Sequence, residues 1–151
     1  MAFKWLARLI PQSSGDIENS TDLSRAIAVL MLEVAQSDFH ETEEETNTLV
    51  AGLVEHMADS EQTPERLLAD ARSDKANSAG LYEFTRLACT EMSSAARCTL
   101  IEQLWDIAYA DGVIDKYEEA AIRKVSELLY VPHSEFIKAK LAAKKSTIQA
   151  S

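Results

Sequence analysis

The sequence predicts an all-α protein, a compact bundle of about seven or eight helices that contains two pseudo-repeated helical hairpins. Three observations lead to this class: 46% of the 151 residues are hydrophobic, only 4 are glycine, and apolar residues recur at helical spacing along most of the chain. No segment alternates apolar and polar residues as a half-buried strand does. A chain of this length buries enough surface to fold without a disulfide or a metal. Collagen-like, disordered, disulfide-scaffold and membrane-spanning classes are therefore excluded.

The chain is expected to divide into an N-terminal amphipathic segment with a linker (1–19), a helical domain (20–145) and a tail (146–151). Apolar residues of segment 1–10 share one helical face, which suits docking on the protein's own core, on a partner or on a membrane surface, and the first of these is favoured. The polar run Pro11–Asp16 has no periodicity and is expected to be a flexible linker. Charges interrupt segment 1–10, so it resembles neither a signal peptide nor a membrane span, and we expect a cytoplasmic protein.

The first two helices of the domain follow from periodicity and caps. Ser20, Thr21 and Asp22 are capping candidates for a helix that is expected to run to about residue 37. Thr42 followed by Glu45 forms a predicted capping box, which opens a helix to about residue 58.

The remaining helices are predicted in the same way. Thr63 and Pro64 match an N-cap with proline at the first helical position, for a helix to about residue 75. Apolar periodicity predicts further helices over about 81–92, from Ser93 or Ser94 to about 108, over 115–130, and a short last helix that carries Phe136, Ile137 and Leu141.

The two cysteines, Cys89 and Cys98, lie nine residues apart and belong to no Cys-x-x-Cys pair. We therefore expect them to be small core residues in a reducing compartment.

A concealed repeat becomes visible when the chain is compared with itself at a separation of 73 residues. Asp38 then matches Asp111, Thr42 matches Asp115, and Glu45 matches Glu118. In each copy a buried helix ends near an aspartate, and a second helix carries a glutamate seven residues after it. Two such hairpins packed about a pseudo-twofold axis would place both acidic turns on the same side.

The second acidic turn resembles the second half of an EF-hand loop. With Asp111 at loop position five, Gly112 stands at six, Asp115 at nine and Glu118 at twelve. Positions one and three lack carboxylates, which excludes an ordinary EF-hand. A truncated oxygen site for Ca²⁺ or Mg²⁺ remains, with Asp111, Asp115 and Glu118 as ligands, the Val113 carbonyl as a further candidate, and Asp38 and Glu45 joining from the first copy.

A simpler alternative explains part of this pattern and is favoured over a metal. Asp115 caps a helix and Glu118 completes its N-terminal box, while Gly112 permits a positive φ. Capping does not explain Asp111 as readily. In the first copy, a transition-metal pair of His40 and Glu44 is weaker than the alternative of a solvated acidic helix start.

Charge is distributed unevenly along the chain, whose formal net charge is −10. Residues 16–70 contain 14 acidic and 2 basic residues, a local charge of −12, so a protein partner of this half is expected to be basic. Binding to nucleic acid is not expected, because an acidic surface repels phosphates. Four lysines form a small basic patch near the C-terminus, which would suit an acidic neighbour or an anionic surface, although a solvated end is the commoner explanation: Lys138, Lys140, Lys144 and Lys145.

No motif of an enzyme is present. The sequence has no nucleophile with an orienting base, no phosphate loop, no His-Glu-x-x-His helix and no paired cysteines. We expect no enzymatic activity, and a metal-dependent hydrolase ranks last among the hypotheses.

The repeat resembles the tellurite-resistance protein B (TerB) family over about residues 20–142. The resemblance is carried by Ala108, Asp111, Gly112, Asp115 and Glu118, with a degenerate first copy at Ala35, Asp38, Thr42 and Glu45. It implies a bacterial all-helical protein with an acidic metal site and a link to stress or toxic-oxyanion resistance. Phe39 stands where the family has glycine in the first copy.

Two hypotheses of function follow. The first is a non-enzymatic module that binds a divalent cation weakly at its acidic turns. The second is a metal-free interaction or scaffold module, in which the acidic half recruits a basic partner and segment 1–10 is the anchor. A homo-oligomer is compatible with either.

Overall fold

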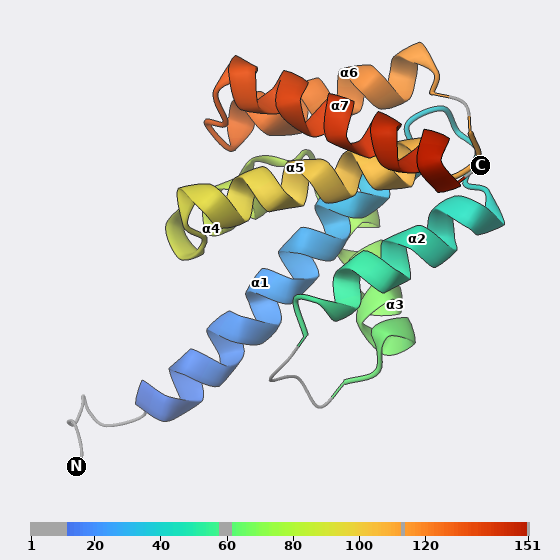
Figure 1. Ribbon diagram of the computed structural model, residues 1–151. Helices are drawn as coiled ribbons and strands as arrows, with labels where there is room; N and C mark the ends of the chain where they lie inside the picture. The colour runs from blue at the N-terminus through green and yellow to red at the C-terminus, as the bar shows by residue number, and fades with distance from the viewer. Residues whose placement is uncertain (1–11, 58–61, 113, 151) are drawn as a thin grey trace.

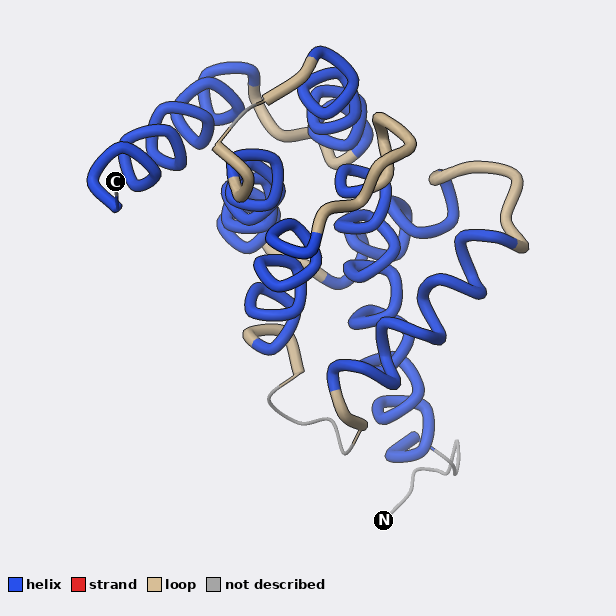
Figure 2. Tube along the Cα trace, turned by 90° about the vertical axis from the view of Figure 1, so that its right-hand side faces the viewer, coloured by secondary structure: helices blue, strands red, loops and turns tan. Residues whose placement is uncertain are grey.

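The structure is a computed structural model that describes residues 12–57, 62–112 and 114–150, with side chains for 22–57, 62–112 and 114–144. These residues form seven α-helices and no strand, which confirms the predicted all-α class. The helices are α1 (Gln12–Ala35), α2 (Glu43–Val54), α3 (Pro64–Ala76), α4 (Tyr82–Glu91), α5 (Ser94–Tyr109), α6 (Lys116–Leu128) and α7 (His133–Ala150). Figure 2 shows these helices joined by loops.

The C-terminal half of α1 forms the centre of the bundle (Figure 1). Every residue from Ala26 to Ala35 except Glu33 is buried. A helix that is apolar on all sides must be covered on all sides, and α1 contacts α2, α3, α4, α5 and α6. The acidic turn that follows α1 is therefore attached to the most enclosed element of the fold.

The two predicted hairpins are α1–α2 and α5–α6. The second helix of the first hairpin begins at Glu43, and the second helix of the other begins at Lys116, 73 residues later. The contacts are reciprocal, because α1 packs against α6 as α5 packs against α2, and α1 and α5 also contact each other. This arrangement matches the predicted pseudo-twofold packing.

Helix α7 covers α5 and is longer than the short final helix that the sequence predicts. Trp105 of α5 is fully buried, and its ring lies 5.3 Å from the ring of Phe136 on α7. The Lys140 ammonium lies 5.4 Å from the Trp105 ring and 2.5 Å from Oε1 of Glu119 on α6. These contacts join α5, α6 and α7 into one layer.

The predicted linker after Pro11 is wrong for Gln12–Asp16, which form the first turns of α1. Ser20, Thr21 and Asp22 consequently lie inside the helix and do not cap it. Once a helix is nucleated, each further residue adds a hydrogen bond, so a polar run without proline extends a helix whose other half is held by the core. Periodicity does not detect such an extension, because the added turns lack an apolar face.

The C-terminal end of α2 also differs from the prediction. This helix ends at Val54, about one turn before the predicted end near residue 58.

Cys89 and Cys98 are both free and partly exposed, which corrects the expectation that they are core residues. Cys89 packs against the edge of the core.

The amphipathic segment 1–10 lies outside the described residues. Among the helices that are described, none has the length and apolar character needed to cross a membrane.

Candidate metal centre

The turn between α1 and α2 carries the first acidic residue of the candidate site. The backbone N–H of Phe39 donates to the Gln36 carbonyl at 3.0 Å, and Phe39 adopts a left-handed φ of +67°. The N–H of His40 donates to Oδ1 of Asp38 at 3.0 Å. These bonds hold Asp38 at the inner side of the turn, where it is half-buried.

The turn between α5 and α6 has the same backbone pattern 73 residues later. The N–H of Gly112 donates to the Tyr109 carbonyl at 2.9 Å, and Gly112 has a φ of +85°. The predicted repeat therefore extends to the conformation of the turn. Phe39 takes the left-handed position that glycine occupies in the second copy.

Both helices that follow the turns start with a complete capping box, as predicted. In α2, the Glu45 N–H donates to Oγ1 of Thr42 at 3.1 Å, and the Thr42 N–H donates to Oε1 of Glu45 at 2.9 Å. In α6, the Glu118 N–H donates to Oδ1 of Asp115 at 2.8 Å, and the Asp115 N–H donates to Oε1 of Glu118 at 3.2 Å. Each glutamate thereby uses one carboxylate oxygen for its cap and keeps the other for the interior.

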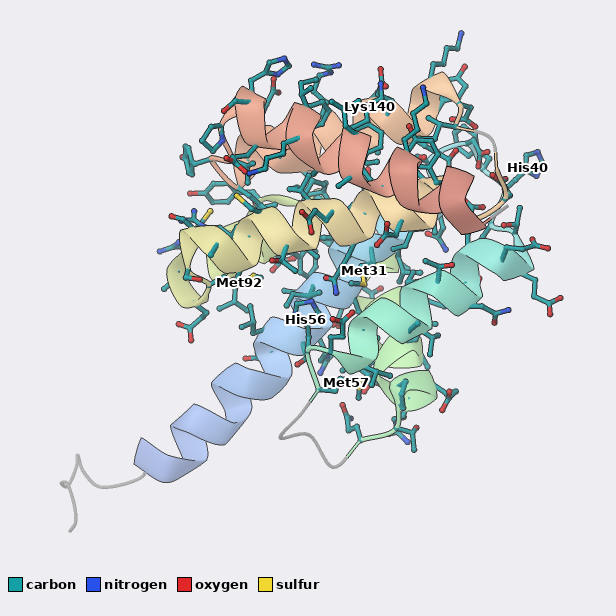
Figure 3. The ribbon with its side chains drawn as sticks, viewed as in Figure 1. Met31, His40, His56, Met57, Met92 and Lys140 are labelled. Carbon is teal, nitrogen blue, oxygen red and sulfur yellow. The ribbon has the colours of Figure 1, made fainter. Side chains whose placement is uncertain are left out.

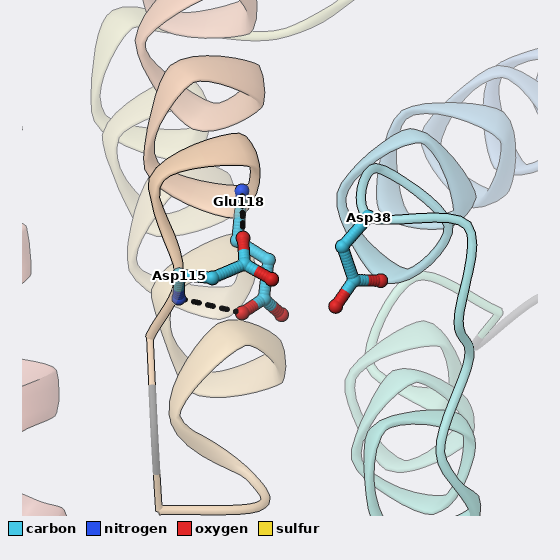
Figure 4. Close-up of side chains that lie close together, drawn as sticks. All are labelled: Asp38, Asp115 and Glu118. Atoms are coloured by element: carbon cyan, nitrogen blue, oxygen red, sulfur yellow. Dashed lines mark hydrogen bonds between the residues drawn. The ribbon is translucent and has the colours of Figure 1, made fainter.

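Three carboxylates from the two hairpins converge beside these caps. Asp38, Asp115 and Glu118 each place a carboxylate oxygen within 4.8 Å of the other two (Figure 4). Oxygen ligands on opposite sides of one Ca²⁺ ion are about 5 Å apart, because each Ca–O distance is about 2.3–2.6 Å. The three side chains are therefore close enough to share one ion.

Glu45 lies next to this triad and faces Glu118. Glu45 is 1% exposed and Glu118 is 2% exposed, and Oε2 of each accepts no hydrogen bond from any donor in the described part of the chain. The two side chains approach within hydrogen-bonding range of each other. Burial, followed by the neighbouring Glu45, raises the pKa of Glu118 well above its ordinary value, although the cap bond with Asp115 opposes this. The pair thus needs either a shared proton or a cation.

A group of side chains that the sequence analysis missed supports the first turn. Glu41 forms a two-pronged ion pair with Arg72 of α3, with N–O distances of 2.9 and 2.7 Å. Glu41 also accepts hydrogen bonds from Gln36 and Thr46. The Arg72 guanidinium is the main reason that the pKa of Glu41 falls to about 2. Arg72 lies 31 residues from Glu41, and no local pattern relates the two.

The residues predicted from sequence are only partly brought together. Asp38, Asp115 and Glu118 form the triad, and Glu45 adjoins Glu118. Asp111, one of the three carboxylates predicted as ligands in the second turn, is exposed and lies outside the triad. The Val113 carbonyl falls outside the described residues. The EF-hand numbering therefore identifies the turn but not which carboxylates come together beside it.

Comparison with known proteins agrees with this architecture. The family described as tellurite resistance protein TerB matches residues 24–141, which is more than half of the 151 residues. This chain belongs to the TerB family. The TerB region starts within α1 and ends within α7, so it includes both hairpins and the whole acidic cluster. No curated protein and no solved structure matches the chain.

Proposed function

We propose that this TerB-family protein is a non-enzymatic helical module that binds one divalent cation, Ca²⁺ or Mg²⁺, between its two hairpins. Asp38, Asp115 and Glu118 supply carboxylate ligands, and Glu45 completes the negative charge around the ion. Carboxylate oxygens are hard donors, which suit these two ions better than transition metals. The ion would bridge the α1–α2 turn and the start of α6.

One observation carries the proposal, the pair of buried carboxylate oxygens, Oε2 of Glu45 and Oε2 of Glu118, that have no donor. A buried acceptor without a partner costs about 1–3 kcal/mol, and more when it is charged. Capping explains Oε1 of each glutamate but leaves Oε2 unexplained. A cation would satisfy both oxygens and would also use Asp38, which makes no contribution to either capping box.

We infer the biological role from the family and from the charge of the chain. TerB membership supports a link to tellurite and stress resistance, with scaffolding as the module's work. The charge of −12 over residues 16–70 supports a basic protein as the partner of the first half. Absence of nucleophilic or phosphate-binding motifs in the sequence supports a role without catalysis.

Titration with CaCl₂ or MgCl₂, followed by amide NMR, tests cation binding. We expect saturable shifts in residues 36–45 and 111–118, with a dissociation constant on the order of 10⁻⁴ to 10⁻³ M for such an incomplete oxygen site. Asp38→Asn and Glu118→Gln should each weaken binding at least tenfold, because each removes a charged ligand.

The matched control is Glu43→Gln, which neutralises an exposed carboxylate in the first turn of α2 and should leave affinity within about twofold. Asp111→Asn shows whether Asp111, the predicted ligand that lies outside the triad, takes part in binding. Absence of saturable shifts with both ions at millimolar concentration, or equal loss in Glu43→Gln and Glu118→Gln, would refute the proposed site.

A further inference from the structure

Phe39 is the most exposed large apolar side chain among the described residues, at 90%. It also has a left-handed backbone, which costs a non-glycine residue about 1–2 kcal/mol. None of the described helices covers it, and glycine occupies the equivalent position in the second turn. The side chain therefore contributes little to the stability of an isolated molecule.

Helix α7 has an apolar strip that the described residues leave exposed. Ile137 and Leu141 lie one turn apart and are 37% and 59% exposed. Lys138 and Lys144 lie beside them, and both are exposed. We call these four residues the α7 strip. Its apolar centre is flanked by positive charge.

The surroundings of Phe39 carry the opposite charge. Glu43 and Glu44 are exposed at the start of α2, and Asp38 precedes Phe39. We call these four residues the acidic corner. In Figure 3, His40 marks this corner at the right-hand edge, and Lys140 marks α7 along the upper edge.

Charge along the chain is divided in the same way, negative in the N-terminal half and positive near the C-terminus. Residues 16–70 have a local charge of −12, whereas residues 133–150 contain four lysines and one glutamate. Opposed charges around an apolar centre favour one orientation of two molecules and suppress others. A second copy of the chain offers each surface the complement that it lacks.

We propose that the protein self-associates by docking the acidic corner of one copy on the α7 strip of a second copy. Phe39 packs between Ile137 and Leu141 as the central anchor. Glu43 and Glu44 face Lys138 and Lys144 around it. Such an aromatic anchor within a charged rim is the usual anatomy of a protein interface. The contact uses no cation, so it does not depend on the proposed metal centre.

Sedimentation velocity of the full chain between about 10 µM and 1 mM tests the proposal. We expect concentration-dependent association of the wild type, and at least tenfold weaker association of Phe39→Gly and of Leu141→Ser. Phe39→Gly relieves the left-handed strain and Leu141→Ser changes an exposed residue, so both variants should fold, which circular dichroism verifies. Tyr82→Ser, at a 70% exposed aromatic on α4, is the control and should associate like the wild type.

Mixing the variants makes the test specific to the two surfaces. Each variant keeps one half of the contact, so an equimolar mixture of Phe39→Gly and Leu141→Ser should associate more strongly than either variant alone. A wild type that stays monomeric at 1 mM would overturn the proposal, as would unchanged association in both variants. Binding of a monomeric wild type to anionic vesicles through Leu141 would instead assign the α7 strip to a membrane surface, and would also overturn it.

Discussion

Phe39 and Gly112 occupy the same position in the two acidic turns and share the same left-handed backbone. In both turns the N–H of this residue bonds to the carbonyl three residues earlier. The turn itself thus requires the positive φ, whichever residue is present. Glycine meets that requirement without strain, and phenylalanine does not.

Substitutions at these two positions should have opposite effects on stability. Phe39→Gly should raise the free energy of unfolding by about 1 kcal/mol, and Gly112→Ala should lower it by about the same amount. A Cβ on Gly112 would meet no atom within 4 Å, so the loss reports backbone strain and not a clash. Urea denaturation measures both values, and an unchanged Gly112→Ala would show that the turn tolerates an L-residue there.

Helices α2 and α6 each carry a glutamate as their third residue. In the sequence, capping and metal binding compete to explain Glu45 and Glu118. The structure shows that capping uses only one oxygen of each, since Oε1 accepts the cap N–H while Oε2 is buried and accepts no hydrogen bond from the described residues. Capping is therefore confirmed for both residues and does not exclude a second role.

Helix α3 positions the first turn through Arg72. Arg72→Ala removes the two-pronged pair with Glu41, and we expect it to lower the free energy of unfolding by about 1 kcal/mol, a modest amount because the arginine is partly exposed. It should also weaken cation binding, because Glu41 lies three residues from Asp38. Thermal unfolding and calcium titration measure the two effects. The ion pair of exposed Arg66 with half-buried Asp70 on the same helix offers a control, and Arg66→Ala should change neither stability nor cation binding appreciably.

Packing of the two hairpins links the stability of the whole molecule to the protonation of Glu118. It buries Glu118 beside Glu45, so Glu118 holds its proton more tightly in the folded state than in the unfolded chain. The unfolded chain releases this proton near its ordinary pKa of 4.5. Because the folded pKa is the higher one, stability from this source is complete below 4.5 and declines as the pH rises toward the folded pKa.

The metal-free protein should consequently be less stable at pH 8.5 than at pH 6.5. Glu118→Gln should reduce this dependence and stabilise the metal-free protein at pH 8 by about 1 kcal/mol, because the amide donates to the unpaired Glu45 oxygen. Saturating Ca²⁺ should restore the wild type at pH 8 but not the variant. Thermal unfolding with EDTA and with Ca²⁺ measures these differences, and a pH dependence equal in the two proteins would place its origin elsewhere.

Much of the fold is encoded locally and was predicted from the sequence. The boxes at Thr42 and Asp115 and the caps at Thr63 and Ser93 each depend on residues within one helical turn of each other. The 73-residue repeat is visible in the sequence because each copy carries the same local pattern. Helix ends outside such motifs were less predictable. The start of α1 was missed because its first turns have no apolar face.

Which residues form the acidic cluster depends on tertiary packing and not on local sequence patterns. The sequence named Asp111, Asp115 and Glu118 as candidate ligands, with Asp38 and Glu45 from the first copy. In the structure Asp38 meets Asp115 and Glu118, Asp111 lies outside this group, and Arg72 supports the turn from another helix. Helical periods and caps are short-range properties, which the order of residues specifies directly. Which carboxylates of separate hairpins meet depends on how α1, α5 and their partners pack, because that packing sets distances between residues more than 70 positions apart.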